Sequence, residues 1–90
     1  MEKVKWFNLS GSEEIKPDKS IDMIGLYCPV PLFRTREAID TMKIGEILEV
    51  FADDPAAESD IQSFTKRTGY KLLKLEKDED VLRFLIEKTK

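Results

Sequence analysis

The chain is 90 residues long, enough for one domain, and its formal net charge is −3. Hydrophobic residues make up 41% of it and recur throughout, which excludes an intrinsically disordered protein. It has no histidine and a single cysteine, Cys28, which excludes histidine-ligated metal sites, histidine-based catalysis and an internal disulfide.

Residues 1–19 differ from the rest of the chain, and we treat them as an N-terminal extension of a domain at residues 20–90. Val4–Leu9 predicts a short strand, after which a polar stretch predicts a linker. Trp6 and Phe7 are available to dock onto the domain or onto a partner, and an ordinary edge contact is the simpler interpretation. The first residues lack a secretory signal and no apolar run is long enough to span a bilayer. We expect a cytoplasmic monomer without membrane insertion.

The domain begins with an apolar–polar alternation at residues 20–24, which predicts a strand ending at a glycine. A helix from Pro29 to about Lys43 follows, because proline is tolerated in the first turn, where its missing N–H needs no partner. Its predicted inward face has helical spacing: Leu32, Thr35, Ala38, Ile39 and Met42.

Residues 46–52 predict a second strand, apolar enough to be central in a sheet. Asp54 is the expected N-cap of a second helix, with Pro55 at its first position and Gly69 as its C-cap. Within that helix, Ala57, Ile61, Phe64 and Thr68 share one face.

Two further strands, at residues 70–76 and 81–87, complete the prediction, with a charged turn at residues 77–80 between them. The element order is β-α-β-α-β-β. Right-handed strand–helix–strand crossovers place both helices on one face of a four-stranded mixed sheet. We therefore expect a two-layer α/β sandwich.

Cys28 is the candidate catalytic residue because it falls at or just before a helix N-terminus. Unbonded N–H groups and the helix dipole there favour thiolate, so we expect a lowered pKa. Arg34 and Arg36 add positive charge further along the helix. The alternative is a small buried hydrophobe, the usual role of a free cysteine. We prefer the exposed thiol because two prolines hold it at a loop-to-helix junction.

A lone thiol without histidine cannot run a hydrolase triad or resolve its own disulfide. It can accept a group from a thiol-bearing partner and pass it to another. Sulfane sulfur carried as a persulfide on Cys28 fits this requirement.

The motif around the cysteine resembles the core of the TusA/SirA-like sulfur carrier family. It is the run Gly25-Leu26-Tyr27-Cys28-Pro29-Val30-Pro31. Later blocks also match in order and spacing: Gly45-Glu46, Ala52-Asp53-Asp54-Pro55-Ala56 and Asp60-Ile61. The resemblance covers about residues 20–88. Gln62 and Tyr70 depart from the family pattern, where many members have proline and histidine.

The resemblance implies a two-layer sandwich and a persulfide-carrying Cys28, with Gly25, Leu26, Pro29 and Pro31 supporting the motif. It implies protein partners that donate or accept sulfur, such as a cysteine desulfurase, a rhodanese or a DsrE-like protein. No cofactor is expected. The pathways of relatives include tRNA thiolation, cofactor synthesis and sulfur oxidation, and the sequence does not choose among them.

Several other residues are candidate partner contacts. Arg34 and Arg36, with Lys43, form either a basic docking face or a solvated helix face. Tyr27 either contacts a partner or covers the turn. Asp53 and Asp54 suggest a metal site less well than a strand end and a helix cap, so we expect no metal. The family resemblance implies that these two aspartates lie near partner surfaces, so they too are candidate partner contacts.

A second function stays open on the sequence. The same fold serves as a non-catalytic binding or redox-regulatory module, in which Cys28 senses oxidation. A nucleic-acid-binding role is disfavoured because no basic–aromatic stripe exists.

Overall fold

The chain folds through six elements in the predicted order, in a computed structural model that describes residues 16–90. The elements are β1 (Lys19–Met23), α2 (Val30–Asp40), β2 (Ile47–Ala52), α3 (Pro55–Thr68), β3 (Lys71–Asp78) and β4 (Val81–Glu87). The strand predicted at Val4–Leu9, with Trp6 and Phe7, lies outside the described residues. Within residues 16–90, no helix is long and apolar enough to cross a membrane.

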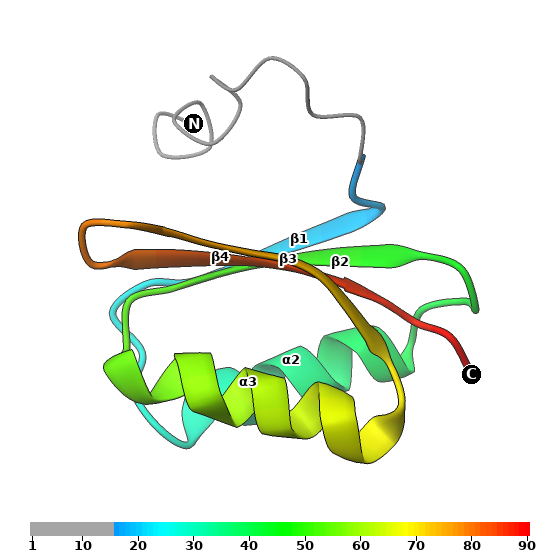
Figure 1. Ribbon diagram of the computed structural model, residues 1–90, viewed down its shortest axis with the longest axis horizontal. Helices are drawn as coiled ribbons and strands as arrows, with labels where there is room; N and C mark the ends of the chain where they lie inside the picture. Colours follow the sequence, from blue (N-terminus) through cyan, green and yellow to red (C-terminus); the bar gives the residue numbers. More distant parts are fainter. Residues whose placement is uncertain (1–15) are drawn as a thin grey trace.

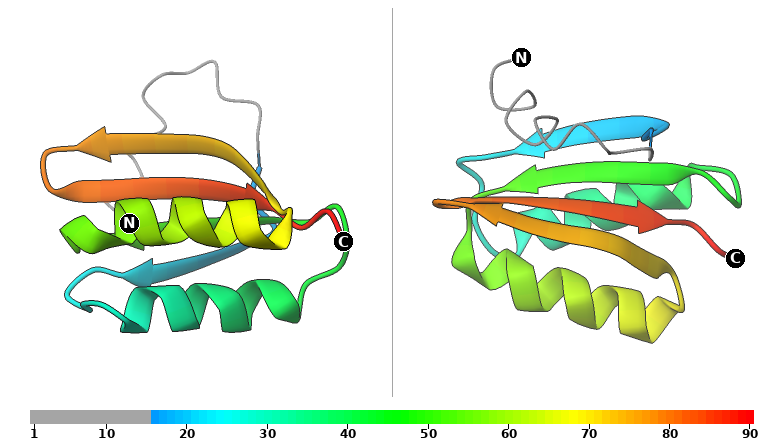
Figure 2. Two further views of the ribbon diagram at one scale, coloured as in Figure 1. Left: turned by 60° about the horizontal axis from the view of Figure 1, so that its bottom comes forward. Right: turned by 45° about the horizontal axis from the view of Figure 1, so that its top comes forward.

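The four strands form one mixed sheet in the order β1-β2-β4-β3. The pair β1 and β2 is parallel, whereas β4 runs antiparallel to both of its neighbours, as the right-hand view of Figure 2 shows. Met23, at the end of β1, pairs with Ala52, at the end of β2. The chain segments that follow these two strands therefore leave the sheet at the same edge.

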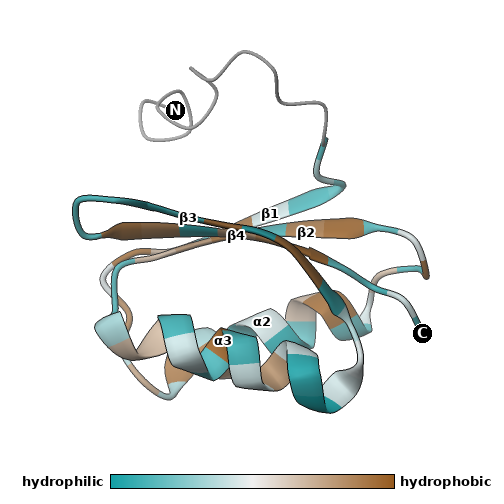
Figure 3. Cartoon of the chain, in the orientation of Figure 1, coloured by the Kyte–Doolittle hydropathy of each residue, from teal (hydrophilic) through white to brown (hydrophobic). Residues whose placement is uncertain are grey.

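Both helices pack on one face of the sheet, which confirms the predicted two-layer sandwich (Figure 1). Ala38 and Ile39 of α2 and Ile61 and Phe64 of α3 face β2 and β4, whose residues are the most hydrophobic of the sheet (Figure 3). The apolar core between the layers consists of Met23, Ala38, Ile39, Met42, Leu48, Val50, Ala52, Ala57, Ile61, Phe64, Leu82, Phe84 and Ile86. Burial of this set stabilises the fold through the hydrophobic effect.

The helix α3 begins and ends as predicted. Asp54 is its N-cap and accepts a hydrogen bond from the Ala56 N–H, while Pro55 is the first helical residue. Gly69 is its C-cap, with a φ of 88° that a residue with a side chain adopts only at a cost.

The helix α2 is shorter than the predicted Pro29–Lys43. Pro29 is its N-cap, and its last residue is Asp40. The chain tightens there because the Thr41 N–H and the Met42 N–H bond to carbonyls three residues back, at Ala38 and Ile39. Met42 still reaches the core after the helix has ended.

The strand β3 starts at Lys71 and continues to Asp78, two residues beyond the predicted end at Glu76. Lys77 and Asp78 pair with Leu82 and Val81 of β4, so the connection is shorter than the predicted four-residue turn. The charged residues at this tip do not oppose strand pairing, because the tip of the hairpin is exposed to water.

Candidate functional site

Cys28 lies on the loop that joins β1 to α2, and it is exposed. It directly precedes Pro29, the N-cap of α2, through a cis peptide bond. The interpretation of this cysteine as a small buried hydrophobe is therefore wrong, and the expected location at a helix start is confirmed. Leu26 and Pro31, by contrast, turn inward: Leu26 packs against the core and Pro31 is buried.

A single carboxylate fixes the residue that carries the thiol. Asp54 Oδ2 accepts a hydrogen bond of 2.6 Å from the Cys28 N–H, and Asp54 Oδ1 accepts one of 3.2 Å from the Ala56 N–H. Asp54 is buried. It therefore caps α3 and anchors the thiol loop at once, and little of it is left for a partner to contact.

The neighbouring carboxylate holds the beginning of the same loop. Asp53 Oδ1 accepts a hydrogen bond of 2.9 Å from the Gly25 N–H, and Gly25 has a φ of 91°. The loop also turns on itself, because the Leu26 N–H donates to the Met23 carbonyl. The pair Asp53–Asp54 is thus an anchor for the backbone of residues 25–28. Among the described residues, no three histidine, cysteine, aspartate or glutamate side chains form a metal cluster.

The sheet topology explains why these contacts form. The thiol loop follows β1 and the two aspartates follow β2, and these strands are parallel neighbours. Segments that leave the carboxyl ends of adjacent parallel strands meet at one edge of the sheet, where ligand and catalytic sites of α/β proteins concentrate. This topological argument could have assigned Asp53 and Asp54 to the loop from the sequence alone.

The pKa of the Cys28 thiol is shifted in the direction opposite to the one expected from the sequence. The pKa of the Cys28 thiol is raised above its ordinary value by partial desolvation, by hydrogen bonding to the Asp60 carboxylate and by the negative charges of Asp60 and Asp54. The prediction of a lowered pKa is therefore wrong. The N-terminus of α2 has no side-chain cap, and its prolines lack N–H groups, so it offers the thiolate little to offset two carboxylates.

Asp60 is the residue of this site that the sequence analysis did not select. It lies on α3, one turn beyond the first turn, and its carboxylate faces the thiol from the neighbouring helix. The sequence contained a signal, since Asp54 caps α3 beside the cysteine and a carboxylate six residues later stays near that end of the helix.

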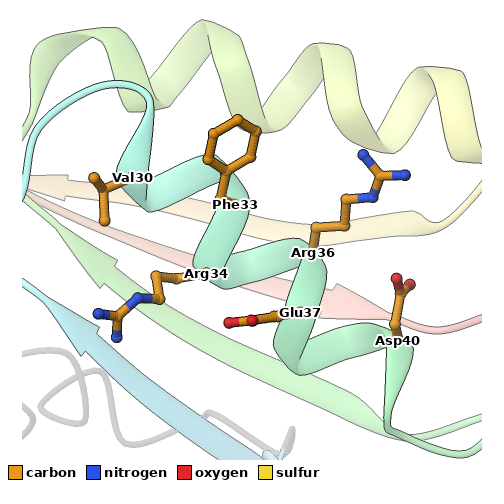
Figure 4. A pocket seen from close by; sticks show the side chains of 6 residues that line it. All are labelled: Val30, Phe33, Arg34, Arg36, Glu37 and Asp40. Atoms are coloured by element: carbon orange, nitrogen blue, oxygen red, sulfur yellow. The ribbon is translucent and has the colours of Figure 1, made fainter.

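Exposed aromatic, basic and acidic side chains lie on α2 and on the turn that precedes it. Tyr27 and Phe33 are large, apolar and exposed. Arg34 projects to one side of α2 together with Glu37, whereas Arg36 projects to the other side together with Phe33 and Asp40 (Figure 4). These residues of α2 line a shallow surface pocket. Arg34 and Arg36 therefore do not form one continuous basic patch.

Comparison with known proteins supports the resemblance in the sequence. The sequence model of the family described as "Sulfurtransferase TusA" matches residues 19–88. A provisionally named sulfur carrier protein of Archaeoglobus fulgidus is 53% identical over 73 residues, covering 80% of this chain and 95% of that protein. The sulfur carrier protein TusA of Allochromatium vinosum is 35% identical over 72 residues, with the same two coverages, 80% and 95%.

A solved structure agrees with the fold. The SirA-like protein from Desulfitobacterium hafniense superposes with a TM-score of 0.68 at 27% identity, covering 80% of this chain and 99% of that one. The family match includes the loop that carries Cys28 and both aspartates that anchor it. The chain therefore belongs to the TusA sulfurtransferase family.

Proposed function

We propose that this protein relays sulfane sulfur as a persulfide on Cys28, taking it from a donor protein and giving it to an acceptor protein. The observation that carries the proposal is an exposed thiol on a loop whose backbone is fixed at Gly25 and Cys28 by two aspartates. A fixed loop presents the sulfur in one orientation, which a transfer between two protein surfaces requires.

The chemistry is a thiol–persulfide exchange in two steps. The Cys28 sulfur attacks the terminal sulfur of the donor persulfide, a new S–S bond forms on Cys28, and the S–S bond of the donor breaks. The donor leaves as a thiolate and takes up the proton that Cys28 gave away, so nothing is oxidised or reduced overall. An acceptor thiol then attacks the terminal sulfur on Cys28 in the same way.

The raised pKa of Cys28 has a consequence for this relay. With Asp60 and Asp54 nearby, the free carrier rests as the thiol, the less nucleophilic form. A donor that brings positive charge to the loop offsets the two carboxylates and favours the thiolate. The carrier is then activated where it meets its donor, and it is less prone to attack other molecules.

Tyr27, with Arg34 and Arg36 of α2, is the partner contact that we assign. Tyr27 precedes the thiol directly, is exposed, and offers apolar area beside it. A cysteine desulfurase or a rhodanese would serve as donor, and a DsrE-like protein is a candidate partner in the relay. We place the relay in the cytoplasm, where reducing conditions keep a single cysteine free.

The test is intact-mass spectrometry after incubation with a cysteine desulfurase and cysteine. We expect the protein to gain the mass of one sulfur atom, and the gain to disappear in Cys28→Ser. Ser63→Ala, at an exposed position of α3, is the matched control and should load normally. Absence of any gain, from both a desulfurase and a rhodanese donor, would refute the relay.

One observation favours a second function, a redox-regulatory or binding module. A raised thiol pKa is what a module without sulfur transfer would show, because such a thiol need not be a good nucleophile. In that case Cys28→Ser would keep full affinity for the partner protein, and wild type would take up no sulfur. The relay predicts sulfur uptake by wild type, so one mass measurement separates the two functions.

A further inference from the structure

Asp60 lies at the border between the buried and the exposed face of α3. It follows Ala57 by three residues and precedes Phe64 by four, and both of these side chains belong to the core. The opposite border of α3, at Thr65, lines a surface pocket together with Leu72 of β3. Asp60 is therefore on the border that faces α2, which runs beside α3 in the helical layer (Figure 2).

The carboxylate of Asp60 is poorly supplied with hydrogen-bond donors. Within residues 16–90 its one partner is the Cys28 thiol, and no ion pair joins it to Arg34 or Arg36 of α2. A thiol is a weak donor, and Asp60 is half-buried, so water solvates the carboxylate only in part. This carboxylate therefore keeps the capacity to accept a stronger, charged donor.

The second carboxylate whose charge acts on the thiol has no such capacity. Asp54 is buried, and its two oxygens accept the N–H groups of Cys28 and Ala56. A charged group that arrives from outside can thus reach Asp60 but not Asp54.

We propose that Asp60 is a specificity-determining residue of the exchange at Cys28, and that it selects partner thiols with a positive charge beside the sulfur. This inference rests on the proposed sulfur relay and names the class of thiol that the relay serves. In a partner protein, a lysine or an arginine next to the reacting cysteine supplies the charge. A thiol beside a negative charge is disfavoured by the same carboxylate.

The release of the sulfur shows how the selection works. The acceptor thiolate attacks the terminal sulfur of the Cys28 persulfide, a new S–S bond forms on the acceptor, and the S–S bond to Cys28 Sγ breaks. Cys28 leaves as a thiolate and takes up the proton that the acceptor gave away, so nothing is oxidised or reduced overall. Negative charge grows on the atom that Asp60 faces, and a cation on the acceptor offsets the repulsion.

Small thiols of opposite charge test the selection without a partner protein. The carrier is loaded by a cysteine desulfurase and cysteine, freed of reagents, and mixed with cysteamine, which has an ammonium group, or with mercaptopropionate, which has a carboxylate. Intact mass follows the loss of sulfur from Cys28. The rate ratio of the two thiols in wild type, divided by the ratio in Asp60→Asn, cancels their intrinsic reactivities. We expect this quotient to be about 3–10 at low salt and to approach one at high salt.

Glu58→Gln is the matched control, because it also removes one negative charge from α3. Glu58 lines a cavity with Lys77 and Asp80 of the β3–β4 hairpin and does not act on the thiol, so its quotient should be near one. Asp60→Glu keeps the charge and should keep the preference for cysteamine. A quotient near one for Asp60→Asn, or an equal quotient for Glu58→Gln, would overturn the proposal. Should Asp60→Asn fail to fold, wild type decides, since a preference that does not shrink with salt would overturn it too.

Disulfides separate the selection from the relay itself. Cystamine and dithiodipropionate carry the same two charges, and Cys28 attacks one of their sulfurs and releases the other as a thiol, without any sulfane sulfur. Asp60→Asn should lower the preference for cystamine several-fold. A wild type that prefers cystamine but takes up no sulfur would support the selection and refute the relay. A wild type that takes up sulfur without any charge preference would refute the selection alone.

Discussion

The two helices of this protein begin and end in different ways, although each starts at a proline. The helix α3 carries its own signals: Asp54 caps its first turn, Glu58 adds a negative charge there, and Gly69 closes it in the left-handed conformation. The helix α2 has no side-chain cap, no acidic residue in its first turn and no basic residue in its last. It ends at Thr41 in an ordinary right-handed conformation.

The difference shows where the thiol loop gets its rigidity. Because α2 does not cap itself, the residue that precedes it is held by α3, through the bond from the Cys28 N–H to Asp54. The helix α3, which has its own caps, thus supports the thiol loop, and α2 follows the loop that carries the thiol. Departures from local sequence preferences are expected at functional sites. In this protein the departure is the missing side-chain cap of α2, and it lies next to Cys28.

The largest effect is expected on removing the shared support. Asp54→Ala deletes the N-cap of α3 and leaves the Cys28 N–H without its acceptor. The free energy of unfolding should fall by about 2–5 kcal/mol, the sum of a lost cap and a lost hydrogen bond to a charged group. Urea unfolding followed by circular dichroism measures this loss.

Glu58→Ala is the matched control, because it removes a charge from the same turn of α3 without removing the cap. It should cost about 0.3–1 kcal/mol at low salt and less at high salt. Equal losses for Asp54→Ala and Glu58→Ala would mean that the shared carboxylate has no special part in the fold.

A smaller effect is expected at the other end of α3. Gly69→Ala places a side chain at a φ of 88°, which should cost about 1–2 kcal/mol. The added Cβ also approaches the side chain of Lys90, whose flexible end can move away. Thr41→Ala at the end of α2 keeps an ordinary backbone and should cost less. Thermal unfolding of both variants tests this, and a greater loss in Thr41→Ala would reverse the contrast between the two helices.

The local signals of α3 explain how much could be predicted from the sequence. Its cap, its proline and its terminal glycine are adjacent to the helix, so both of its ends were predicted correctly. The end of α2 was not, because no glycine or proline marks Thr41 and a tight backbone turn stops the helix.

The site was predictable to a lesser degree for the same reason. The exposed cysteine at a helix start follows from residues close together in the chain. Its anchor, Asp54, is 26 residues away, and its carboxylate neighbour, Asp60, is on another helix. These contacts depend on the parallel pairing of β1 and β2. The prediction for the pKa of Cys28 considered the positive end of the helix and not these carboxylates, so the direction of the shift was predicted wrongly.

Asp53 can be compared directly with Asp54, because it anchors the same loop but does not cap a helix. Asp53→Ala should lower the free energy of unfolding by about 0.5–1 kcal/mol, since the Gly25 N–H is exposed and water can replace the lost acceptor. Asp53→Asn keeps an acceptor oxygen and should be nearly neutral. Urea unfolding of the two variants checks this order, and a loss in Asp53→Ala as large as in Asp54→Ala would contradict the leading part given to Asp54.

The smallest effect on stability, and the most direct one on chemistry, is expected at Asp60. Asp60→Asn removes the negative charge that faces the thiol, so the pKa of Cys28 should fall. The rate of alkylation by iodoacetamide follows the thiolate fraction, so its rise with pH should move to lower pH. Ser59→Ala, the neighbouring exposed position on α3, is the control and should leave the profile unchanged.

The sign for stability follows from the same shift. The pKa of Cys28 is higher in the folded protein than in the unfolded chain, so its contribution to stability is present below the unfolded pKa and is lost as the pH rises through the folded pKa. Asp60→Asn should reduce this alkaline loss and leave the stability at neutral pH almost unchanged. An alkylation profile that does not move would mean that α3 supports the loop mechanically but does not control the charge of its sulfur.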